Sequence, residues 1–171
     1  MDVYNLLKET TSLAKSKDFD GAISLLNEIY LSYDVLDSDV IKIIPYFQKA
    51  GRYTELEKYC LEVLIPLVIK INRKIFSDNC KQTQVAFICL SVSKIFNKLV
   101  LCSKREKNED DQFKFYNKEK EYYKKYEEYL SAGDQLQTEF FDLVMNDTFD
   151  LEPEKWPETF KNRYSCFIES T

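Results

Sequence analysis

The sequence has no histidine among its 171 residues, and this absence removes several kinds of chemistry at once. Without imidazole there is no Ser-His-Asp or Cys-His nucleophile, no histidine metal ligand and no histidine pH switch. Glycine and proline are also scarce, at three and four residues. So few turn formers disfavour a β-sandwich or barrel with many tight connections. They also exclude a glycine-rich phosphate-binding loop.

Cysteine is present in an odd number, and the residues are widely spaced. The five residues are Cys60, Cys80, Cys89, Cys102 and Cys166. No two of them form a C-x-x-C pair, so we expect no metal site and no thioredoxin-type centre. Reduced, mostly buried thiols are typical of a cytoplasmic protein, which is the localisation that we predict.

Signals for export or membrane insertion are also missing from the sequence. The first ten residues, MDVYNLLKET, do not combine a basic head with an apolar core, so we expect no secretory signal. The most apolar stretch, Val63 to Ile69, is far shorter than the ~20 residues that span a bilayer. We therefore expect no membrane partner.

What the sequence does contain is a helical periodicity over one domain, residues 1–171. Hydrophobic residues make up 44% of the chain and recur mainly at spacings of three and four, which predicts an all-α fold. The strongest helix is predicted from about 79 to 104, and a tyrosine-rich helix from about 113 to 132. Gly133 is expected to cap the second of these, with Asp134 as the next N-cap. Pro66 either kinks a helix or lies in the first turn of a new one.

The first part of the chain is an internal repeat with a period of about 34 residues. The segment DFDGA at 18–22 aligns with RYTEL at 52–56, and the apolar positions on either side match in residue class. Lys8 and Lys15 align with Lys42 and Lys49. Two amphipathic helices joined by a short turn with an aromatic residue, recurring with this period, predict stacked helical hairpins.

This pattern resembles the tetratricopeptide repeat (TPR) family over about residues 4 to 68. Gly51 matches the turn glycine of that repeat and Tyr53 the aromatic residue after it. Leu56 occupies the position of the small residue where the two helices cross. In the first copy Phe19 and Ala22 match the same aromatic and small positions. The resemblance implies a short α-solenoid. Because about three units are needed to bury a continuous core, residues 70–132 are expected to form a degenerate third unit and residues 133–171 the capping helices and tail.

The resemblance also implies a binding surface on the concave face, made by the first helix of each hairpin. The candidate residues at those positions are Tyr4, Lys8, Lys15, Lys42, Gln48 and Lys49. Equivalent lysines on the two hairpins would line a groove suited to an acidic or amphipathic peptide. Ordinary solvated lysines at the edges of helices fit the same pattern.

A second candidate surface is acidic and lies at the C-terminal end. From Gly133 onward there are 9 acidic and 3 basic residues, a net charge of −6, whereas the preceding part carries +1. The candidate residues of this surface are Asp142, Asp147, Asp150, Glu152, Glu154 and Trp156. Such a surface would attract a basic partner. A solvated capping helix and tail, kept soluble by its carboxylates, also accounts for the charge.

The tyrosines between 116 and 129, mixed with lysines, also fit stacking on single-stranded nucleic acid. The net charge of −5 and the absence of an arginine-rich stripe favour a helix packed by its rings instead. We therefore predict no nucleic-acid partner.

Together these observations predict a non-enzymatic protein–protein interaction module with no cofactor and no metal, whose partner is a protein or peptide. A narrower alternative is a bacterial immunity protein that neutralises a basic toxin domain by direct binding, by analogy with other small acidic proteins. An enzyme that uses carboxylates or a tyrosine, and a scaffold that self-associates through an apolar face, also remain open.

Overall fold

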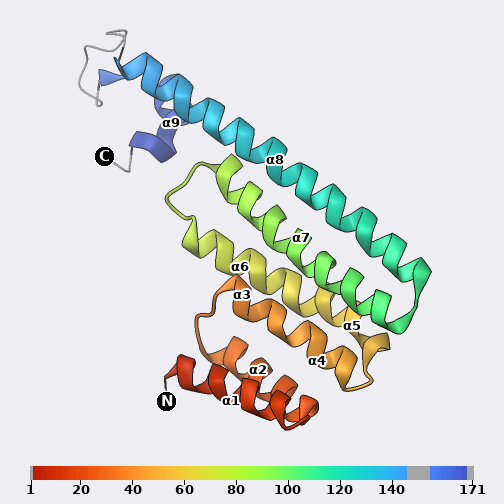
Figure 1. Cartoon of the computed structure of the whole chain (residues 1–171). Helices are drawn as coiled ribbons and strands as arrows, with labels where there is room; N and C mark the ends of the chain where they lie inside the picture. The colour runs from red at the N-terminus through yellow and green to blue at the C-terminus, as the bar shows by residue number, and fades with distance from the viewer. Residues whose placement is uncertain (1, 146–154, 169–171) are drawn as a thin grey trace.

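The computed structural model describes residues 2–145 and 155–168, and every regular element in these two ranges is helical. The predicted all-α fold class is therefore confirmed. Figure 1 shows the helices running back and forth as consecutive antiparallel pairs, which stack in chain order from the N-terminus. Because the helices are amphipathic, each pair buries its apolar edge against the next.

Within residues 2–145 and 155–168, three hairpins make up the stack. The first consists of α1 (Val3–Lys15) and α2 (Phe19–Ser32). In the second, α3 (Asp37–Val40), the 3₁₀ turn η1 (Ile41–Ile43) and α4 (Ile44–Lys49) are paired with α5 (Tyr53–Tyr59), the π-helical turn η2 (Cys60–Leu64) and α6 (Ile65–Ile75). The third consists of α7 (Lys81–Glu106) and α8 (Glu109–Met145), and α9 (Glu158–Ile168) packs against α8.

All three hairpins close with the same turn. Lys17, Gly51 and Lys107 each have a left-handed backbone, with φ values of 67°, 74° and 57°. In each turn the N–H of the following residue donates to the carbonyl five positions earlier: Asp18 to Leu13 at 2.9 Å, Arg52 to Phe47 at 2.9 Å, and Asn108 to Ser103 at 3.0 Å. This Schellman geometry satisfies the free carbonyls at a helix end. Lys17 and Gly51 occupy equivalent positions in the two copies, as the alignment predicts.

Pro66 lies at the start of α6 and is accommodated by the π-helical turn just before it. There the N–H of Ile65 donates to the carbonyl of Cys60, five residues earlier. Because the wider turn changes the hydrogen-bond register where proline supplies no N–H, α5, η2 and α6 continue as one helical run. Of the two expectations for Pro66, a position in the first turn of a helix is confirmed, because Pro66 is the second residue of α6.

The predicted helix end at Gly133 is wrong. Helix α8 runs through it without interruption, so Asp134 is not an N-cap. Gly133 is buried against α7, and a Cβ atom placed on it would lie 2.5 Å from Oγ1 of Thr83 and 3.4 Å from the backbone nitrogen of Thr83. The glycine therefore allows α7 and α8 to approach closely.

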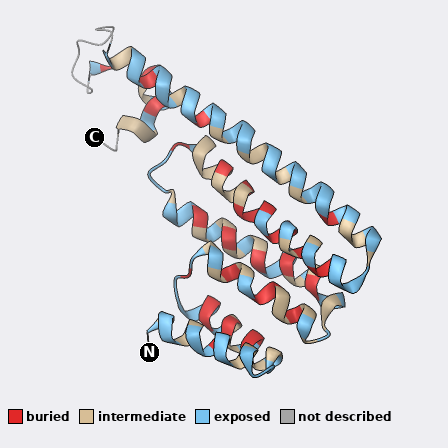
Figure 2. Cartoon of the chain, viewed as in Figure 1, coloured by how far each residue is buried: buried red, intermediate tan, exposed pale blue. Residues whose placement is uncertain are grey.

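The main core extends from α2 to α8. Its largest fully buried side chains include Leu26, Ile43, Leu64, Ile95, Leu99 and Phe115. A separate aromatic cluster joins α8 to α9 and consists of Phe140, Trp156, Phe160 and Tyr164. Figure 2 shows buried residues on the facing sides of the stacked helices and exposed residues along most of α8.

Helix α7 is the central helix of this core, packed against α4, α6 and α8. Among the described helices it is the one with the length and apolar composition of a membrane span. Half of its most apolar 18-residue stretch is buried within the protein. Core helices of soluble proteins meet the same criteria, so this is weak evidence for a membrane.

Buried polar groups fix the second hairpin against the third. Nδ2 of Asn72 in α6 lies 3.2 and 3.1 Å from the two carboxylate oxygens of Asp37 and 3.0 Å from Oγ of Ser91. Ser91 on α7 also donates to Asp37. Because Asn72 and Ser91 are almost fully buried, these bonds specify how α3, α6 and α7 meet.

Candidate functional site

A groove of about 530 Å³ lies between the first helices of the first two hairpins. Its lining residues are Tyr4, Leu7, Lys8, Thr11, Ser12 and Lys15 on α1, Asp39 on α3 and Lys42 on η1. We call this the α1–α3 groove. Four of the six predicted concave-face residues, namely Tyr4, Lys8, Lys15 and Lys42, are brought together in it.

The helix α1 presents cations to the groove. Lys8, Thr11 and Lys15 follow one another at spacings of three and four, so they share one face of the helix. Nζ of Lys8 lies 4.3 Å from the ring centroid of Tyr4, a cation–π contact that positions the ammonium group. The Thr11 hydroxyl donates to the carbonyl of Leu7 at 3.0 Å. Its hydrogen is therefore already used within the helix, and the lysines remain as donors.

The opposite wall of the groove is a single ion pair. Nζ of Lys42 lies 2.6 Å from Oδ1 of Asp39, whose side chain is only 13% exposed. With three lysines against one aspartate, the groove carries a net charge of +2. A groove of this charge favours acceptor groups, carboxylates in particular.

Gln48 and Lys49 lie outside this groove, contrary to the prediction. Nε2 of Gln48 donates to Oε1 of Glu106 at 2.6 Å, and Nζ of Lys49 lies 5.5 Å from the ring centroid of Phe19. The reason is the 3₁₀ turn η1, in which each residue advances by about 120° instead of about 100°. The residues after this turn are therefore rotated relative to a regular α-helix.

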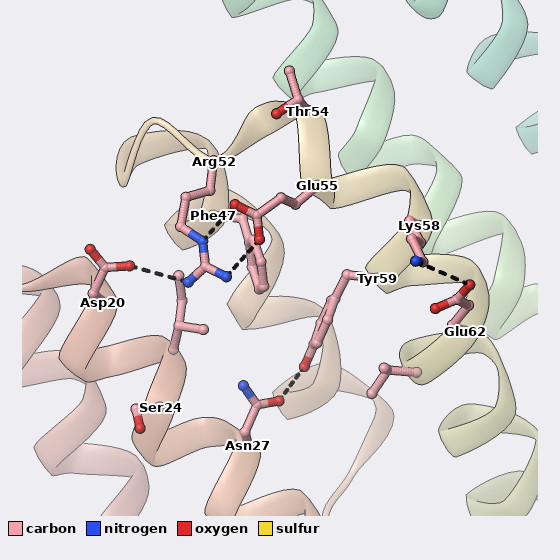
Figure 3. Close-up of a pocket in the computed structure, with 12 residues that line it drawn as sticks. Asp20, Ser24, Asn27, Phe47, Arg52, Thr54, Glu55, Lys58, Tyr59 and Glu62 are labelled. Atoms are coloured by element: carbon pink, nitrogen blue, oxygen red, sulfur yellow. Dashed lines mark hydrogen bonds and ion pairs between the residues drawn. The ribbon is translucent and has the colours of Figure 1, made fainter.

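A second hollow, of about 620 Å³, lies between α2 and α5 (Figure 3), where no candidate site was predicted. Arg52 crosses it: Nε and Nη2 donate to the carboxylate of Glu55 at 3.1 and 2.7 Å, and Nη1 donates to Asp20 at 3.2 Å. The guanidinium group also lies 4.7 Å from the ring centroid of Phe47. Arg52 therefore joins the first hairpin to the second.

The floor of this α2–α5 pocket is aromatic. The rings of Phe47 and Tyr59 lie 4.6 Å apart, and the Tyr59 hydroxyl donates to Oδ1 of Asn27 at 2.5 Å. Burial raises the pKa of Tyr59 well above its usual value, so the phenol stays neutral. These contacts hold the first hairpin against the second, so the pocket has a structural role. Polar residues at helical spacing on α2 (Asp20, Ser24 and Asn27) are the one sequence signal for it.

The predicted acidic surface at the C-terminal end is described only in part. Asp142 is exposed on α8, whereas Asp147, Asp150, Glu152 and Glu154 lie outside the described residues. Trp156 is only 8% exposed, because its ring packs edge-on against Phe160 with centroids 5.0 Å apart. Its ring is therefore part of the α8–α9 cluster, and the prediction that it lies on a docking surface is wrong.

The tyrosine-rich stretch at 116–129 divides between two faces of α8. Tyr122 stacks on Phe96, with centroids 5.7 Å apart, and Tyr126 approaches Phe87 at 6.2 Å. Tyr116 and other members of the stretch are exposed. Packing against α7 thus explains only part of the pattern.

The described groups with lowered pKa values do not converge on one site. Hydrogen bonds from Lys125 and Lys118 lower the pKa of Glu121 to about 2. A hydrogen bond from Arg52 lowers the pKa of Glu55. Both carboxylates are exposed partners in surface ion pairs, which is a structural role. No group of three or more His, Cys, Asp or Glu residues in the described ranges could hold a metal ion.

Comparison with known proteins gives no relative. No protein-family model, no curated protein and no solved structure matches the chain. Evidence about function therefore comes from the geometry and charge of the molecule.

Proposed function

We propose that this chain is a non-enzymatic protein-interaction module of the TPR-like type, which binds a polypeptide partner in the α1–α3 groove. The observation that carries the proposal is that Tyr4, Lys8, Lys15 and Lys42, residues from two separate hairpins, line one groove. A net positive groove favours an acidic or amphipathic segment of the partner.

The TPR-like part of the proposal is supported by equivalent aromatic residues. Phe19 and Tyr53 each lie two residues after a left-handed turn residue, and each reaches the hairpin that comes next. The ring of Phe19 lies 6.3 Å from that of Tyr46 on α4. The hydroxyl of Tyr53 lies 2.9 Å from Oγ of Ser103 on α7. Aromatic residues at equivalent positions of two units thus each contact the next unit, one through a ring and the other through a hydrogen bond.

The non-enzymatic part is supported by where the nucleophilic groups lie. Burial raises the pKa of the Cys60 thiol, which makes the thiolate scarce and the group unreactive. Ser91 is buried between helices and bonded to Asp37 and to the carbonyl of Phe87. These groups serve packing. Four of the five cysteines, all but Cys166, are buried free thiols. This also supports the proposed cytoplasmic location.

Photo-crosslinking from within the groove tests the proposal. A photoreactive p-benzoylphenylalanine in place of Thr11 should capture a discrete polypeptide in cells. Capture should be lost when Lys8, Lys15 and Lys42 are all changed to Gln, because the attraction to carboxylates is then removed. The matched control is Lys49→Gln, which changes a lysine outside the groove and should leave capture unchanged.

Two outcomes would refute the proposal. The first is that the polypeptide is captured equally by the triple variant while circular dichroism shows both proteins folded. The second is that the groove position yields no adduct at all. Increasing salt should weaken capture. Exposed charges about 10 Å apart are already screened at physiological ionic strength, and higher salt also screens closer pairs, such as a groove lysine and a carboxylate of the partner.

A further inference from the structure

We propose that the exposed side of α8 binds a second copy of this chain, forming an antiparallel dimer. The surface is a row of residues at alternating spacings of three and four, which we call the α8 seam. Its members are Phe113, Tyr116, Lys120, Tyr123, Glu127 and Leu130. This proposal does not depend on the α1–α3 groove.

The aromatic side chains of the α8 seam face solvent. Phe113 is 70% exposed, Tyr116 49% and Tyr123 41%. The core-facing residues of the same helix include Phe115 and Tyr122, which lie on a different side of it. Because the last unit of a helical stack usually presents a polar outer face, a row of exposed rings on it indicates an interaction surface.

The position of the α8 seam leaves it accessible. Helix α8 packs along α7 through a different side, which includes Phe115 and Tyr122, and α9 packs around Phe140, beyond the end of the seam. Figure 1 shows α8 as the outermost helix of the third hairpin. Phe113 and Tyr116 border a hollow of about 450 Å³ that a side chain from another molecule can enter.

The spacing of the α8 seam is that of a two-helix coiled coil. Side chains that alternate every three and four residues fit as knobs into the holes of a facing helix. The outward face of a surface helix is usually polar or charged, whereas the α8 seam carries three exposed aromatic rings. A helical partner is therefore the geometry that this spacing favours.

A second copy fits because the seam is complementary to itself when reversed. With a twofold axis between residues 121 and 122, Phe113 faces Leu130 of the partner copy, an apolar pair. Tyr116 then faces Glu127 of the partner copy, so a hydroxyl meets a carboxylate. Lys120 faces Tyr123 of the partner copy, so an ammonium group meets a ring. Each contact occurs twice, as in an isologous interface.

The local charge also permits this pairing. Residues 113–130 contain five lysines and four glutamates, a net charge of +1, whereas the whole chain carries −5. The helix faces therefore do not repel each other strongly. The seam is about 26 Å long, from 17 residue steps at 1.5 Å, which is short for a permanent interface. We expect a dissociation constant in the micromolar range.

Sedimentation equilibrium over about 5 to 500 μM tests the dimer. The mass should rise with concentration from 20.3 kDa towards twice that value. The double variant Phe113→Ser, Tyr116→Ser should dimerise at least about tenfold more weakly, because a few aromatic anchors carry much of the binding energy of an interface. The matched control is Leu31→Ser, which removes an 88% exposed leucine on α2 and should leave the mass curve unchanged.

The proposal is overturned if the wild-type protein stays monomeric at the highest concentration, or if the double variant associates as strongly as wild type. A second measurement tests the register. A p-benzoylphenylalanine in place of Phe113 should label the partner copy near Leu130, and labelling near residue 113 would overturn the antiparallel arrangement. The triple lysine variant of the α1–α3 groove should still dimerise, which separates this proposal from the proposed function.

Discussion

Changing Gly133 to Ala should destabilise the protein, although alanine is the better helix former. Gly133 lies inside α8, so the substitution alone would gain about 1 kcal/mol of helix propensity. The added Cβ, however, would lie 2.5 Å from Oγ1 of Thr83 and 3.4 Å from the Thr83 backbone nitrogen. Overpacking of this kind costs about 1–3 kcal/mol. A contact as short as 2.5 Å belongs at the upper end of that range, about 2–3 kcal/mol, so the expected net loss is about 1–2 kcal/mol in the free energy of unfolding.

The neighbouring side chain decides the sign of this effect. Oγ1 of Thr83 lies 3.1 Å from Sγ of Cys80, so the hydroxyl already has a contact and cannot turn away without losing it. Changing Thr83 to Ala removes the atom closest to the new methyl group. In that background Gly133→Ala should stabilise the protein by about 0.5 kcal/mol, because the helix propensity gain remains. The two substitutions should therefore be coupled by about 2 kcal/mol.

Urea denaturation, followed by circular dichroism, measures this double-mutant cycle on four proteins. They are the wild type, Gly133→Ala, Thr83→Ala and the double variant. Gly51→Ala is the control: Gly51 has φ of 74°, and a methyl group added there would have no atom within 4 Å, so its loss comes from backbone strain. That loss should be unaffected by Thr83→Ala. The reasoning is refuted if Gly133→Ala destabilises the wild type and the Thr83→Ala variant by the same amount. Equal losses would mean that the cost comes from the backbone at position 133, as at a helix cap, and not from contact with Thr83.

Three further outcomes are expected from the packing. Phe140→Ala should shift the fluorescence emission of Trp156, the single tryptophan, to longer wavelength and leave the circular-dichroism midpoint nearly unchanged, because the aromatic cluster is separate from the main core. Asn72→Ala should lower the free energy of unfolding by about 2–3 kcal/mol in urea denaturation, because Asp37 loses a buried partner. Burial raises the pKa of Tyr53 to about 12, so its contribution to stability is complete below about pH 10 and is lost as pH rises to 12. In urea denaturation at successive pH values, Tyr53→Phe should accordingly lose less stability than wild type over that window.

The helices and the first two turns are predictable because their signals are local. Apolar spacing marks each helix face, and the repeat alignment places Lys17 opposite Gly51, which share the same left-handed turn. Gly133 is misleading for the same reason. A glycine after a long helix resembles a cap locally, and only the contact with Thr83, on the neighbouring helix α7, explains it.

The groove is predictable where positions that align in the sequence repeat also occupy matching places in the two hairpins. Lys8 and Lys42 face the same hollow because they occupy matching places on two stacked hairpins. Lys49 does not, because a 3₁₀ turn precedes it and no residue type announces that turn. Trp156 comes after acidic residues in the sequence, but its packing partner, Phe140, lies on helix α8, distant in the sequence.

The residue two positions after the turn differs between the third hairpin and the first two. After Lys17 and Gly51 the second residue is aromatic and reaches the next hairpin. After Lys107 the corresponding residue is Glu109, and the third hairpin has no described hairpin beyond it. The exposed aromatic side chains of this last unit instead lie along the outer side of α8. If these side chains bind a second copy, the outer side of α8 forms a dimer interface in the place where a further hairpin would otherwise continue the stack.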